Sequence, residues 1–141
     1  MRFLEIKKLL HVSTLGLALL LSSLSTRADE TAQGKALFAS YCESCHGPDG
    51  DGNGPAAEAF ILKPRAFALA AFKFDTNADW KTGTDQDLTD VIRKGPAVYG
   101  GSQQMPGWPS LTDEEIRQLI VYIRSLEVEV TRSSLRGTNM Q

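Results

Sequence analysis

The chain has 141 residues, of which 15 are basic and 17 are acidic, so its formal net charge at pH 7 is −2. Such a balance lacks the basic surface that nucleic-acid binding requires, and we expect no nucleic-acid partner. The length suits one domain.

The first 28 residues have the pattern of a secretory signal peptide. Basic residues precede an apolar stretch from Val12 to Leu24, and Thr26-Arg27-Ala28 offers a cleavage site before Asp29. This stretch is shorter than the roughly 20 residues that span a bilayer. We therefore expect residues 1–28 to be cleaved, a periplasmic location and no stable membrane insertion; retention as an anchor is the alternative. The segment holds four of the 15 basic and one of the 17 acidic residues, so cleavage would leave a net charge of −5.

A first helix is predicted over residues 31–41. Its apolar face repeats at i, i+3, i+4 and i+7 and consists of Gly34, Leu37, Phe38 and Tyr41. Because glycine disfavours helix formation, its presence on this face suggests that another helix approaches closely there.

Residues 42–46 read Cys-Glu-Ser-Cys-His, the attachment sequence of a c-type haem. Two intervening residues make one helical turn, so the thiols of Cys42 and Cys45 lie on the same side and can form thioethers with the porphyrin. His46 can then bind the iron as its proximal ligand. The competing interpretations are a redox dithiol, a structural disulfide and a zinc site. Zinc needs three or four ligands, a dithiol belongs in a βαβ pattern, and a disulfide leaves His46 without a role.

The middle of the chain predicts a glycine-rich turn at 47–55, a short helix at 55–62 and an irregular stretch at 66–83. The aromatic residues of this stretch could line a haem pocket; they are Phe67, Phe72, Phe74 and Trp80. A further helix is predicted from Asp85 to Lys94. Thr84 and Asp87 form a capping box at its start, and Gly95 ends it.

Met105 lies in a loop before the last predicted helix and is our candidate for the distal iron ligand. Pro106 restricts Met105 toward an extended backbone, which would stiffen the loop. Core packing of Met105, ligation by Met140 and an open iron site are the alternatives.

The last helix is predicted from a capping box of Thr112 and Glu115 to Leu126. Its apolar residues have helical spacing, and they are Ile116, Leu119, Ile120, Ile123 and Leu126. We expect residues 29–126 to form one domain and residues 127–141 to form a polar tail without regular structure.

Between residues 30 and 126 the chain resembles a class I cytochrome c. The resemblance rests on Gly34 and Phe38, the Cys42–Gly47 motif, Met105-Pro106 and the segment Tyr122–Leu126. It implies an all-α fold of three to five helices around one covalently attached haem c, with the first and last helices crossing at Gly34 and Tyr122. It also implies a backbone carbonyl, near a proline, that accepts a hydrogen bond from His46. The candidates for this and other haem contacts are Pro55, Pro64, Arg65, Trp80 and Trp108.

A haem with histidine and methionine ligands has both axial positions occupied by protein, which suits electron transfer rather than catalysis. We therefore expect a periplasmic monohaem carrier, not an enzyme, that exchanges single electrons with redox proteins by Fe(III)/Fe(II) cycling. The alternative is a dedicated haem c subunit of a larger respiratory oxidoreductase. The chemistry would be the same, and only the permanence of docking would differ.

Overall fold

The structure is a computed structural model that describes residues 27–137, with side-chain surroundings for residues 27–127. The predicted signal peptide, apart from residues 27 and 28, and Met140 lie outside the described residues. The chain divides into two units, Met1–Glu30 and Thr31–Gln141, and the fold below is that of the second.

All regular elements between residues 27 and 137 are helical, which confirms the predicted all-α class. An N-terminal helix ends at residue 41 and is followed by α2, Glu43–His46. The longer helices are α3, Asp85–Lys94, and α4, Asp113–Gly137. Three short 3₁₀ helices lie in the connecting segments, and they are η1 at Ala57–Ala59, η2 at Phe67–Leu69 and η3 at Pro96–Tyr99. No described helix is long and apolar enough to cross a membrane.

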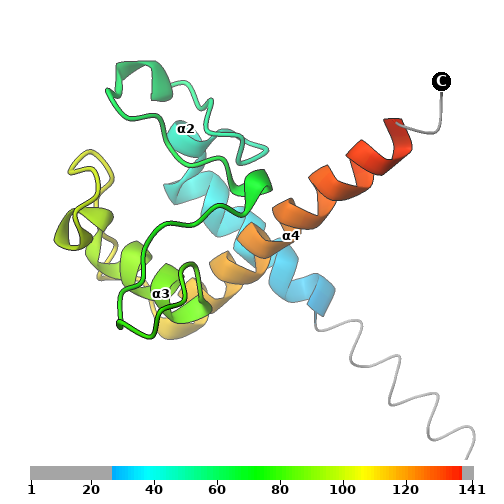
Figure 1. Ribbon diagram of the computed structural model, residues 1–141. Helices are drawn as coiled ribbons and strands as arrows, with labels where there is room; N and C mark the ends of the chain where they lie inside the picture. Colours follow the sequence, from blue (N-terminus) through cyan, green and yellow to red (C-terminus); the bar gives the residue numbers. More distant parts are fainter. Residues whose placement is uncertain (1–26, 138–141) are drawn as a thin grey trace, which may run out of the picture. The chain divides into compact units, whose positions relative to one another are not determined.

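The N-terminal helix crosses α4, and their contact forms the centre of the core (Figure 1). A Cβ atom added to Gly34 would clash with the Gln118 carbonyl oxygen and would lie 2.9 Å from the Tyr122 Cβ. The two backbones therefore touch at Gly34, as the sequence predicted. The Phe38 ring, almost fully buried, lies 5.2 Å from the Tyr122 ring and 5.9 Å from the Phe67 ring, measured between centroids.

Two elements differ in length from the prediction. The expected helix at 55–62 is reduced to the 3₁₀ turn η1, because this segment turns back to bond the α2 backbone. Helix α4 continues past Leu126, where we expected it to end, and reaches Gly137. The sequence from 127 to 136 has neither glycine nor proline, so it contains no helix stop before Gly137.

The segment between α2 and α3 packs Phe67 of η2 into the core, and hydrogen bonds to Asp87 hold the part next to α3. Asp87 of α3, only 1% exposed, accepts hydrogen bonds from the backbone N–H and the hydroxyl of both Thr76 and Thr84, with distances of 2.6 to 2.9 Å. Burial alone would raise the pKa of Asp87, but these hydrogen bonds outweigh it and lower the pKa to about 2. The capping box predicted at Thr84 is confirmed, and Asp87 also binds the loop at Thr76.

Candidate functional site

Cys42 and Cys45 lie one turn apart in a backbone that continues from the N-terminal helix. The Cys42 N–H donates to the Phe38 carbonyl at 2.8 Å, and the His46 N–H donates to the Cys42 carbonyl at 2.9 Å. Both thiols are free and partly buried. Burial, together with the charge of Cys45, raises the pKa of the Cys42 thiol to about 12. A reactive dithiol needs the thiolate, so this burial disfavours a redox dithiol. Among the described residues, no three His, Cys, Asp or Glu side chains are grouped to hold a metal ion.

His46 is buried, and its imidazole is fixed by two contacts. Its Nδ1 lies 3.0 Å from the Arg65 carbonyl oxygen, and its ring stacks on Phe67 with centroids 4.6 Å apart and planes at 21°. Because a carbonyl can only accept, Nδ1 carries the proton and Nε2 keeps its lone pair for a metal. Burial lowers the pKa of His46, against the opposing effect of the Arg65 hydrogen bond, and so favours the neutral imidazole that binds metals.

The carbonyl that binds His46 therefore comes from the segment next to Pro64. Pro55 and Pro64 were both candidates for marking this position, and the acceptor is Arg65, directly after Pro64. Pro55 instead belongs to the glycine-rich turn. Arg65 thus contributes its backbone carbonyl to the site as the hydrogen-bond acceptor of His46. The chemistry of its side chain does not predict this role.

The glycine-rich turn wraps closely around α2. A Cβ atom on Gly54 would lie 2.5 Å from the Ser44 carbonyl oxygen, and the Ala56 N–H donates to that oxygen at 2.8 Å. The Gly52 N–H donates to the His46 carbonyl at 2.8 Å. This turn therefore satisfies carbonyls at the end of α2 that a four-residue helix leaves open. The sequence predicted a turn here but not its contact with α2.

Met105 is half-buried in the loop between η3 and α4, and this loop is bonded to the end of α3. The Trp108 N–H donates to the Ile92 carbonyl at 2.8 Å, and a Cβ atom on Gly107 would lie 2.7 Å from the Arg93 carbonyl oxygen. The loop backbone is thus fixed directly after Pro106, which would help to hold a weak thioether ligand at Met105. Ligation of iron by Met105 stays a prediction.

The two tryptophans differ in their surroundings. Trp108 is half-buried, packs against the core and meets the Tyr41 ring at 5.0 Å between centroids. Trp80 is 95% exposed and has a backbone φ of 66°, in a turn where Asp75 accepts from the Asp79 and Trp80 N–H groups. Trp80 therefore does not pack with Phe67 and Phe72 against the core, although the sequence grouped the three.

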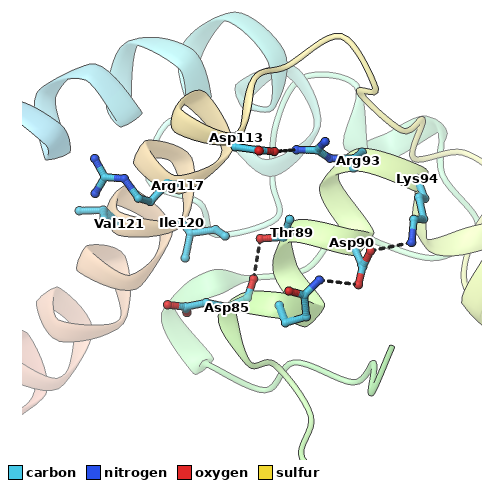
Figure 2. A pocket seen from close by; sticks show the side chains of 10 residues that line it. Asp85, Thr89, Asp90, Arg93, Lys94, Asp113, Arg117, Ile120 and Val121 are labelled. Atoms are coloured by element: carbon cyan, nitrogen blue, oxygen red, sulfur yellow. Dashed lines mark hydrogen bonds and ion pairs between the residues drawn. The ribbon is translucent and has the colours of Figure 1, made fainter. Parts of the chain in front are cut away.

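A shallow depression between α3 and α4 contains none of these residues. It is lined by charged side chains that pair with one another, such as Arg93 with Asp113 at 2.5 Å and Lys94 with Asp90 at 2.7 Å (Figure 2).

The arrangement of Cys42, Cys45 and His46 has the chemistry that a c-type haem needs, with two free thiols on one turn and a neutral imidazole with Nε2 available. The paired charges of the depression do not.

Comparison with known proteins identifies relatives of the chain. Residues 29–123 match the family described as "Cytochrome C oxidase, cbb3-type, subunit III". The Cbb3-type cytochrome c oxidase subunit FixP of Rhizobium meliloti (strain 1021) is 35% identical over 95 residues, which are 67% of this chain and 27% of that protein. The corresponding subunit CcoP of Cereibacter sphaeroides is 29% identical over 98 residues, again 27% of its length. The chain thus spans about a quarter of the length of these curated relatives.

A solved structure also resembles the chain. It belongs to the Kuenenia stuttgartiensis reducing HAO-like protein complex Kustc0457/Kustc0458, with a TM-score of 0.55 and 33% sequence identity. The likeness covers 67% of this chain and 41% of that one.

Proposed function

The chain belongs to the family of subunit III of cbb3-type cytochrome c oxidase, as a class I c-type cytochrome domain, and we propose that it is a haem c electron-transfer subunit of a larger respiratory oxidoreductase. Both curated relatives are named as oxidase subunits. These names support the subunit. The sequence alone had favoured the free periplasmic carrier. The domain's own task is the transfer of single electrons in either case.

The observation that carries the haem-binding part of this proposal is the His46 imidazole, fixed by Arg65 and Phe67, beside two free thiols. Cys42 and Cys45 would hold the porphyrin through thioethers, His46 Nε2 would bind the iron and Met105 would supply the second axial ligand. The haem supplies reversible one-electron Fe(III)/Fe(II) chemistry. Since the full sequence has only two cysteines, we propose a single covalently bound haem.

The surrounding residues support electron transfer because they restrict movement of the ligands. Arg65 holds the His46 tautomer through its carbonyl, Phe67 holds the ring plane, and the glycine-rich turn covers α2. A site held in this way changes little between two redox states. We propose that the domain works in the periplasm after export by residues 1–28, with redox proteins as electron donor and acceptor.

Haem attachment is tested by denaturing electrophoresis with haem staining. The haem should stay with the polypeptide, and the variant with Cys42→Ala and Cys45→Ala should lose it. Haem that separates from the unaltered chain would contradict covalent attachment.

The distal ligand is tested by Met105→Ala, with Met140→Ala as the matched control. Met105→Ala should abolish the weak long-wavelength band of methionine-ligated ferric haem, lower the midpoint potential and admit added ligands, while Met140→Ala should leave all three unchanged. The opposite result would reject Met105.

The choice between subunit and free carrier is tested on the tagged full chain in its native organism. A subunit should purify from mild detergent at a fixed ratio with its oxidoreductase and should stay bound at high salt. A chain that elutes alone, and whose electron exchange slows with salt, would be a free carrier. Asp49→Asn is the variant for the salt test, because Asp51 already accepts two hydrogen bonds from Asn53 within its turn.

A further inference from the structure

A column of flat side chains connects His46 to the surface of α4. The His46 ring stacks on Phe67, and Phe67 stacks on Phe72 with centroids 6.2 Å apart and planes at 29°. The guanidinium carbon of Arg124 lies over the other end, 5.3 Å from the centroid of Phe72. The column passes from α2 through η2, which packs against α4 (Figure 1), and ends at a residue far from the haem motif in sequence.

The outer end of the column is anchored firmly. One amino group of Arg124, Nη2, donates to the Gly83 carbonyl at 2.5 Å and to Asp85 at 2.9 Å, while Nη1 donates to Glu127 at 3.2 Å. A guanidinium is planar and its donors are rigidly placed, so several bonds from one group fix its plane. The fixed guanidinium of Arg124 therefore defines one boundary for Phe72.

Phe72 lies in irregular chain after η2, where its N–H donates to the Ala70 carbonyl at 2.9 Å. It is half-buried, and a Cβ atom on Gly83 would clash with the Phe72 side chain. Gly83 is the same residue whose carbonyl binds Arg124. The ring of Phe72 is thus confined between Phe67 on one side and the Arg124–Gly83 pair on the other.

At the inner end of the column, Phe67 contacts the His46 imidazole and limits its orientation. The hydrogen bond to Arg65 selects the tautomer of His46, but stacking on Phe67 restricts rotation of the imidazole about its bond to Cβ. Groups beyond the ligands that orient a ligating histidine also tune the metal. We infer that Arg124 is a positioning residue for His46, acting through Phe72 and Phe67 on the plane of the imidazole.

This inference rests on haem attachment at Cys42, Cys45 and His46, and it is independent of the partner that receives the electron. It assigns to α4 a second role beside the crossing at Gly34. Arg124 could act in two ways that the test separates. Contact with the Phe72 ring depends on the guanidinium donors that hold Arg124 on Gly83 and Asp85, whereas a long-range effect of charge requires only a cation.

The test compares three variants of the holoprotein with the unaltered chain. Arg124→Gln removes the guanidinium, Arg124→Lys keeps only the charge, and Phe72→Leu removes the ring. The control is Arg117→Gln, which changes the charge equally on the same helix but removes a pair with Glu114. The EPR g values and haem-methyl NMR shifts of the oxidised protein report imidazole orientation, and the midpoint potential is measured alongside.

We expect Arg124→Gln and Phe72→Leu to shift the g values and methyl resonances in the same direction, and the double variant to add little to either. Arg124→Lys should not restore the original values, and Arg117→Gln should leave them unchanged. Spectra unchanged in Arg124→Gln, or restored by lysine, would overturn the inference. A chain that lacks covalent haem in its unaltered form would instead overturn the proposed function, so the two failures are distinguishable.

Discussion

The helix crossing and the segment between α2 and α3 are stabilised in different ways. At the crossing, Phe38, Ile116 and Leu119 are almost fully buried, and two backbones meet at Gly34. Between residues 47 and 84 the chain has only 3₁₀ turns as regular structure, and polar contacts such as those of Asp87 hold it. The crossing thus depends on shape and apolar area, whereas the segment combines the packing of Phe67 and Phe72 against the core with polar residues such as Asp87, each with its own partners. The predictions that follow test this difference.

The largest effect is expected for Gly34→Val at the crossing. The new Cβ would overlap the Gln118 carbonyl, and backbone cannot yield as a flexible side chain can. We expect a loss of at least about 3 kcal/mol in the free energy of unfolding, at the upper end of overpacking costs. Urea unfolding of the holoprotein measures it as a lower midpoint at constant slope.

The control is Ala36→Val, which adds the same β-branched side chain at an exposed position of the same helix. Its cost should be a few tenths of a kcal/mol, as helix propensity predicts. Equal costs at the two positions would mean that the helices do not touch at Gly34.

Asp87→Asn tests the segment between α2 and α3. An amide has one acceptor oxygen, so it cannot accept from both Thr76 and Thr84 as the carboxylate does. Hydrogen bonds to a charged group contribute about 1.5–3 kcal/mol, and we expect a loss of about 2 kcal/mol at pH 7. Asp79→Asn, at an exposed position in the same segment, should cost much less in the same urea experiment.

The same variant has a predictable pH dependence. The pKa of Asp87 is depressed from its ordinary value of 3.8 to about 2 in the folded state. Its stabilising contribution is therefore complete above pH 3.8 and is lost as pH falls through about 2. The stability difference between the unaltered chain and Asp87→Asn should narrow over this range. A difference that stays constant down to pH 2 would show that Asp87 is not a paired carboxylate in the folded protein.

What could be predicted from the sequence follows the same division. The crossing at Gly34 and Tyr122, both capping boxes and the bounds of α3 follow from local patterns and from resemblance to a family, and the structure confirms them. Local rules succeed there because propensity, capping and apolar periodicity all act within one or two helical turns.

The contacts of the candidate site were harder to predict because each is a single hydrogen bond between residues that lie far apart in the sequence. His46 binds the carbonyl of a residue 19 positions away, and a carbonyl is present at every position, so nothing in the side chains marks Arg65. The bonds from Arg124 to Gly83 and from Thr76 to Asp87 likewise leave no periodic pattern. Ligation by Met105 and cleavage after Ala28 stay predictions.

The smallest effect is expected where the two regions are joined. The Tyr122 hydroxyl on α4 donates to the Pro48 carbonyl at 3.4 Å, near the limit for a hydrogen bond. Tyr122→Phe keeps the ring against Phe38 and removes only this bond, so we expect a loss below about 1 kcal/mol. Tyr122→Leu removes the aromatic contact as well and should cost roughly 1 kcal/mol more. Urea unfolding of both variants separates the hydroxyl from the ring. If Tyr122→Phe cost as much as Tyr122→Leu, the hydroxyl would contribute more than the aromatic contact, and the crossing would depend on a polar bond as well as on apolar packing.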